Sequence, residues 1–177
     1  LPFIDFDGDR IISSTEALKL KEIPKHLIVV GGGVIGLELG QVYNRLGSDV
    51  TVIEFQDRII PNMDGSLSKE LAKVFKKSGV KIMTNHKVKS ISKKDNIVTV
   101  AAENSKAEDQ LFEGDYCLIA IGRSAYTEGL KLSNIGVETD ERGRINVNNN
   151  LQTSLPHIYA IGDVIKGSML AHKAEEE

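Results

Sequence analysis

The stretch His26-Leu27-Ile28-Val29-Val30-Gly31-Gly32-Gly33-Val34-Ile35-Gly36 decides the fold of this chain. Residues 26–30 form a short, continuous apolar run rich in β-branched side chains, which is typical of a parallel strand covered on both faces. After the glycines, apolar residues recur at steps of four, three and four, namely Ile35, Leu39, Val42 and Leu46. This spacing predicts a helix that packs one apolar stripe on the sheet and is ended by Gly47.

Further strands and a second helix are predicted outward from this stretch. Residues 49–54 and 80–83 read as strands, and between them Leu67, Leu71 and Val74 mark an amphipathic helix that ends near Gly79. Short β-branched stretches with polar turns over 85–113 predict an antiparallel meander, and the apolar run 116–121 predicts another buried parallel strand. We therefore expect an α/β fold: a Rossmann-like parallel sheet with helices on both faces and an inserted three-stranded antiparallel β-meander.

Composition and charge exclude several classes of function. The 177 residues include 22 basic and 25 acidic side chains, a net charge of −3, so we expect neither nucleic acid nor a membrane as a partner. No run of about 18 apolar residues occurs, and Asp5 interrupts the first apolar residues too early for a signal-peptide core. These two observations predict a soluble, untargeted chain. The single cysteine, Cys117, excludes dithiol chemistry on this chain, and the four histidines have no metal-binding spacing.

The glycines match G-x-G-x-x-G directly after a predicted strand and at the start of a predicted helix. Gly31 would permit the tight turn, Gly33 would let the backbone approach a pyrophosphate, and Gly36 would let the helix lie close to the strand. Val34 and Ile35 lie in the first helical turn, whose free N–H groups and positive dipole end favour an anion. The alternative is a glycine-rich turn with a purely structural role.

Glu54 favours dinucleotide binding over that alternative. It closes the second predicted strand about 20 residues beyond the glycines, where a carboxylate accepts from the hydroxyls of an adenosine ribose. Its charge would repel a 2′-phosphate, so NAD is preferred over NADP. Glu38 and Gly122 are weaker candidates, each with an ordinary structural explanation, and Asp163 could accept from a ligand hydroxyl or cap the following turn.

Three segments together resemble the dihydrolipoamide dehydrogenase family of flavin disulfide oxidoreductases. They are Gly31–Glu38, Ala160-Ile161-Gly162-Asp163-Val164 and Met169-Leu170-Ala171-His172-Lys173-Ala174-Glu175-Glu176-Glu177. The resemblance implies that 25–145 is an NAD-binding domain, that 1–24 is a linker or stub of an FAD domain, and that 146–177 returns to that domain. It also implies that Glu38 and Gly122 lie towards the nicotinamide, and that Asp163, Met169, Leu170, Ala171 and His172 contact the flavin.

The family's activity implies the partners of the intact protein. The intact enzyme of this family oxidises dihydrolipoamide through a disulfide and FAD, and it passes hydride to NAD. Partners would be NAD(H), the FAD and dimerisation domains of the parent and the 2-oxo acid dehydrogenase complex, in the cytoplasm or, in a eukaryote, the mitochondrial matrix. The family's cysteine pair, His-Glu pair and first glycine motif have no counterpart here, so we expect this chain to bind NAD without turnover. The alternatives are another flavin disulfide reductase or NADH oxidase, and a stand-alone NAD-binding or interaction module.

Overall fold

The computed structural model describes residue 4 and residues 6–177, and the chain divides into two compact units. The first ends at Gly122, and the second spans Arg123–Glu177. The boundary between the two units therefore lies between residues 122 and 123, whereas the sequence suggested a domain boundary between residues 145 and 146. Which cofactor each part serves stays a prediction.

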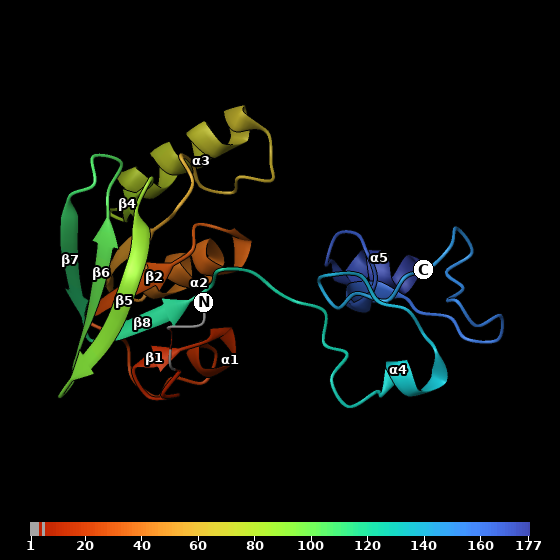
Figure 1. Cartoon of the computed structure of the whole chain (residues 1–177). Helices are drawn as coiled ribbons and strands as arrows, with labels where there is room; N and C mark the ends of the chain where they lie inside the picture. The colour runs from red at the N-terminus through yellow and green to blue at the C-terminus, as the bar shows by residue number, and fades with distance from the viewer. Residues whose placement is uncertain (1–3, 5) are drawn as a thin grey trace. The chain divides into compact units, whose positions relative to one another are not determined.

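The first unit is built on a five-stranded parallel sheet with the order β1-β8-β2-β3-β4 (Figure 1). The strands are β1 (Ile11–Ile12), β2 (His26–Val30), β3 (Asp49–Ile53), β4 (Lys81–Met83) and β8 (Tyr116–Ile119). The central strand β2 is apolar throughout its buried length because both of its faces are covered. Leu27 and Val29 lie in the core under the helices, whereas Ile28 and Val30 lie in a second core on the opposite face.

A three-stranded antiparallel sheet covers that opposite face. Its strands β5 (Lys87–Lys94), β6 (Ile97–Glu103) and β7 (Asp109–Gly114) form the predicted meander, and Val88, Val98 and Val100 pack against Ile28 and Val30. The predicted α/β class, with a parallel sheet, helices and an inserted meander, is confirmed. It differs in one respect: the helices pack in the core of one face, and the meander occupies the face where further helices were expected.

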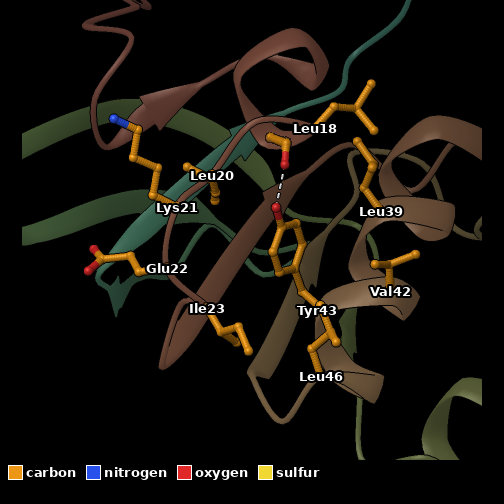
Figure 2. Close-up of a pocket in the computed structure, with 10 residues that line it drawn as sticks. Leu18, Leu20, Lys21, Glu22, Ile23, Leu39, Val42, Tyr43 and Leu46 are labelled. Atoms are coloured by element: carbon orange, nitrogen blue, oxygen red, sulfur yellow. Dashed lines mark hydrogen bonds between the residues drawn. The ribbon is translucent and has the colours of Figure 1, made fainter.

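Helix α2 (Val34–Arg45) lies where the sequence predicted it, but it turns a different face to the sheet. Its buried residues are Gly36, Leu37, Gly40 and Tyr43, whereas Val42 and Leu46 are 50% and 53% exposed. The predicted apolar stripe is therefore confirmed at Leu39, which packs against the core, and wrong at Val42 and Leu46. Two glycines on the inner face bring the helix backbone close to the strands, and the outer stripe instead borders a shallow groove with Leu18, Leu20 and Ile23 (Figure 2).

Helix α3 (Gly65–Lys77) shows a second difference of the same kind. Leu67 and Val74 are exposed, and Ser68 and Phe75 are the buried residues, so of the predicted stripe only Leu71 packs against the core. The Ser68 hydroxyl can be buried because it donates to the carbonyl oxygen of Ile59 at 2.8 Å. Asp64 caps the helix by accepting from the amide of Ser66 at 2.7 Å.

Residues 1–24, which the sequence suggested as a linker, contribute structure to the first unit. Within the described residues of this segment, β1 pairs with β8, and α1 (Ser14–Ala17) follows with a capping box formed by Ser13 and Glu16. The Tyr43 hydroxyl donates to the carbonyl oxygen of Ala17, which ties α1 to α2. Residues 11 and 12 of this segment are therefore part of the sheet, and the assignment of the segment to a flavin domain stays a prediction.

The second unit has little regular structure. It contains α4 (Leu132–Ile135), a 3-10 turn η1 (Gly162–Val164) and α5 (Ala171–Glu176) around a small core that includes Val137, Ile145 and Ile165. The asparagine-rich stretch 146–150 forms a turn within this unit, where the Asn148 side chain accepts from two backbone amides. None of the helices described in either unit has the length and apolarity that spanning a membrane requires.

Candidate functional site

The glycine loop joins β2 to α2 at the carboxyl end of the parallel sheet. The Gly31 amide donates to the carbonyl oxygen of Ile53 at 2.9 Å, and its φ of +108° is unfavourable for any residue with a side chain. A Cβ on Gly31 would also overlap the carbonyl oxygen of Ala120, and a Cβ on Gly36 would overlap that of Gly31. Two glycines are thus required by close packing of the loop, the helix and β8.

Gly33 differs from these two because nothing lies within 4 Å of the position its Cβ would take. Its absent side chain therefore leaves open space in front of the backbone. Gly33 is the N-cap of α2, and within the described part of the chain no side chain caps this helix. The N–H groups of the first turn, from Val34 to Gly36, are thus available to an anion that approaches the helix end.

Glu54 lies directly beside this loop, at the end of β3, and is only 8% exposed. Its Oε2 accepts from the Gly32 amide at 2.6 Å, and its Oε1 accepts from the Gln56 amide at 2.7 Å. The two bonds fix the carboxylate, and each oxygen keeps a lone pair for a further donor. The sequence placed Glu54 near the glycines, and the structure adds the direct bond between them.

Ile60 supports the loop from the other side, and sequence reasoning missed it. Its amide donates to the carbonyl oxygen of Gly32 at 2.8 Å, so Gly32 is held by both Ile60 and Glu54. Ile60 has a φ of +41°, which is unusual for a β-branched residue. The run Ile59-Ile60-Pro61 gives no signal of this conformation, because local propensity disfavours it.

The other candidate residues are more dispersed. Glu38 is exposed on α2, and Gly122 is exposed three residues beyond β8. In the second unit, Asp163 lies in η1, and its carboxylate is 3.5 Å from the guanidinium of Arg123. The structure therefore brings together Gly31–Gly36 and Glu54, with Gly122 beyond the end of the neighbouring strand.

The remaining candidates lie at the start of α5. Met169 is partly buried, Leu170 is the N-cap residue, and Ala171 and His172 are exposed in the first helical turn. Sequence reasoning placed a helix start here, and α5 begins at Ala171. These residues belong to the second unit, and their role in ligand binding stays a prediction.

The single cysteine, Cys117, is not one of the residues of the glycine loop or of the carboxylate beside it. Cys117 is completely buried in β8, and burial raises the pKa of its thiol to about 12. A thiol in this state is neither accessible nor ionised near neutral pH, so it cannot act as a nucleophile. The described residues of the site therefore offer backbone donors and carboxylates, which suit binding of a nucleotide.

Comparison with known proteins decides the family. The model of the pyridine nucleotide-disulphide oxidoreductase family matches residues 4–177. The chain belongs to this family. Dihydrolipoyl dehydrogenase 1 from mitochondria of Arabidopsis thaliana is 48% identical over 178 residues, covering all of this chain and 35% of that protein. The mitochondrial dihydrolipoyl dehydrogenase of Dictyostelium discoideum is 49% identical over 180 residues, again covering all of this chain and 37% of that protein.

Solved structures of flavoprotein disulfide reductases share the fold. LpdA from Mycobacterium tuberculosis superposes with a TM-score of 0.89 at 32% identity, covering 99% of this chain and 38% of that chain. The HOCl-induced flavoprotein disulfide reductase RclA from Escherichia coli gives a TM-score of 0.88 at 33% identity, covering 98% and 38%. The resemblance to dihydrolipoamide dehydrogenases is confirmed by the Arabidopsis thaliana and Dictyostelium discoideum relatives, which carry the name dihydrolipoyl dehydrogenase. The chain spans little more than a third of the length of the curated relatives it matches.

Proposed function

We propose that this chain is the NAD(H)-binding portion of a dihydrolipoyl dehydrogenase. The intact enzyme would oxidise dihydrolipoamide through a disulfide and FAD and pass hydride to NAD. Relatives with 48% and 49% identity carry that name, which supports the substrate assignment. The observation that carries NAD binding is the Glu54 carboxylate, held 2.6 Å from the Gly32 amide beside an open glycine loop.

The residues of the loop fit a dinucleotide. The open position at Gly33 and the uncapped N-terminus of α2, with Val34 and Ile35, would receive the pyrophosphate. Glu54 would accept from the ribose hydroxyls, and its negative charge would disfavour the 2′-phosphate of NADP. Glu38 and Gly122 would lie towards the nicotinamide. When bound, NAD supplies the hydride acceptor, and the chain's own residues bind and orient it.

FAD is the second cofactor of the proposed parent enzyme. Asp163, Met169, Leu170, Ala171 and His172 would contribute contacts to it from the second unit. The Asp163 carboxylate lies 3.5 Å from the guanidinium of Arg123 and is partly exposed, so it is open to a further donor. We propose these contacts from the family resemblance, with the exposed start of α5 as support.

This chain alone should bind NAD without oxidising dihydrolipoamide. Disulfide exchange needs two thiols and an accessible thiolate, whereas Cys117 is the single cysteine and is buried. The proposed partners are the FAD and dimerisation domains of the parent and, through it, the components of a 2-oxo acid dehydrogenase complex. The plant and Dictyostelium relatives are named as mitochondrial proteins, which supports a mitochondrial location if the parent is eukaryotic.

Calorimetric titration tests the proposal. The chain should bind NAD and NADH, and it should bind NADP at least about tenfold more weakly because the Glu54 charge opposes the 2′-phosphate. Glu54→Gln removes the charge and turns an NH2 group towards one of the two backbone amides that the carboxylate accepts from, so it should weaken NAD binding by at least about 1.5–3 kcal/mol, the range for a hydrogen bond to a charged group. Unchanged NAD affinity in the variant would disprove the ribose assignment. Turnover of dihydrolipoamide by the purified chain would disprove the proposal that this chain binds NAD without catalysing the reaction.

A further inference from the structure

A second cavity lies away from the glycine loop, between α3 and the edge strand β4. Its volume is about 620 Å³, within the range of about 300–1,000 Å³ that small-molecule sites occupy. Apolar side chains line its inner part, including Ile59, Ala72, Val80, Ile82 and Met83. None of the residues that the proposed NAD site uses lines this cavity, so it is a separate feature of the first unit.

The rim of this cavity is strongly basic. Lys69 and Lys76 line it from α3, Lys81 from β4 and Arg58 from the loop after β3, against one carboxylate, Asp57. The lining thus carries three more positive than negative charges, although the whole chain has a net charge of −3. Such a local excess of one sign over an apolar wall concentrates ions of the opposite charge.

Lys69 and Lys76 are free to bind a ligand on the α3 side of the sheet, whereas Lys81 shares the opposite face with its register partner Thr51. Among the ion pairs of the described residues none involves Lys69, Lys76 or Lys81, whereas Lys73 on the same helix pairs with Glu70 at 3.0 Å. Lys69 and Lys76 are seven residues apart, so two turns of α3 place them on one face, with Ala72 between them. Ammonium groups at that spacing can converge on one anion above the apolar wall.

We propose that this cavity binds a small organic phosphate, with its phosphate held by Lys69 and Lys76 and its apolar part against Ala72 and Ile82. Lysine ammoniums act as point charges and suit a phosphate dianion, which accepts from several donors at once. The apolar lining selects for an attached hydrocarbon or aromatic group over the bare ion. This site is independent of the proposed NAD function.

Titration of the full chain with 1-naphthyl phosphate tests the proposal, since the probe combines a dianion with a flat apolar body. Amide shifts in NMR spectra should map to α3 and β4, and not to residues 31–36. Inorganic phosphate and 1-naphthol, which each lack one half of the probe, should bind at least about tenfold more weakly. Absence of binding by the wild type, or shifts confined to the glycine loop, would overturn the proposal.

Charge variants give the matched control. The double variant Lys69→Gln/Lys76→Gln removes two exposed cationic groups and should weaken 1-naphthyl phosphate binding about tenfold, with little effect on folding. Lys73→Gln/Lys77→Gln removes two charges from the same helix at positions that do not line the cavity, and should leave binding unchanged. Equal weakening by both variants would mean a general charge effect and would overturn the assigned site. Inorganic phosphate binding as tightly as the probe would equally overturn it.

Discussion

Two glycines of α2 should respond in opposite directions to the same substitution. In Gly36→Ala the added Cβ would overlap the Gly31 carbonyl oxygen and lie 3.0 Å from Cγ1 of Val29 and 3.2 Å from Cβ of Ala120. These backbone and core atoms can move away from the added Cβ only by disturbing the packing of the sheet. In Gly40→Ala the nearest atoms, on Val50 and Val29, would be at 3.5 Å and 3.6 Å, which is ordinary contact. Both residues are helical and buried, so the comparison isolates the clash.

The magnitudes follow from packing and helix propensity. Alanine is better than glycine in a helix interior by about 0.8–1 kcal/mol, so Gly40→Ala should raise the free energy of unfolding by about 0.5–1 kcal/mol. Overpacking costs about 1–3 kcal/mol, so Gly36→Ala should lower the free energy of unfolding by about that amount. For a chain of this size the two variants should differ in Tm by about 4 °C or more.

Urea unfolding provides the assay. Circular dichroism follows the loss of helix, and pulsed labelling of Cys117 reports on the first unit alone, because this single thiol is buried in β8. Gly36→Ala should also weaken NAD binding, since it displaces the helix end from the loop, whereas Gly40→Ala should not. Equal stability of the two variants, or a loss in both, would refute the argument from close approach.

Two further predictions concern titratable groups. Burial works to raise the pKa of Asp7, but Lys93 at 2.6 Å and three backbone amides hold it well below its usual range. The stability contributed by the charged form should be complete above the ordinary aspartate pKa of about 3.9 and be lost as the pH falls below it. Asp7→Asn should therefore lower Tm at pH 7 and reduce the fall of Tm in acid. An unchanged dependence of Tm on pH would contradict the ion pair between Asp7 and Lys93. Cys117, whose pKa burial raises to about 12, should react with a thiol reagent at pH 8 only as fast as the first unit opens, and labelling at the rate of a free thiol would contradict its burial.

The strands and the glycine loop could be predicted from the sequence because each carries a strong local signal. β2 is a continuous apolar run, and G-x-G-x-x-G and Glu54 stand at spacings fixed by the geometry of a strand, a turn and a helix. The short bond between Glu54 and Gly32 follows from that geometry, and no pattern of residues reveals its length. Propensity and periodicity therefore predicted that the glycine loop and Glu54 lie together, but they did not give the contacts between them.

The buried faces of the helices could not be predicted in the same way. Apolar periodicity pointed to Val42 on α2, yet the helix buries Leu37 and Tyr43 together with Gly36 and Gly40, and an apolar count does not register the two glycines that turn this face inward. On α3 the buried Ser68 depends on one tertiary hydrogen bond, to Ile59. The positive φ of Ile60 likewise depends on the bond its amide donates to Gly32. Each of these features is set by tertiary structure, which overrides local preference.

The strand order has a consequence for synthesis. β8 lies between β1 and β2, although more than 80 residues separate it from β2 in the chain. While the polypeptide emerges from the ribosome, one side of β2 lacks its hydrogen-bonding neighbour until residue 119 has left the exit tunnel. Such distant pairing slows folding, and an open strand edge can recruit other chains. A nascent chain paused before β8 should therefore aggregate readily and be a good client for chaperones.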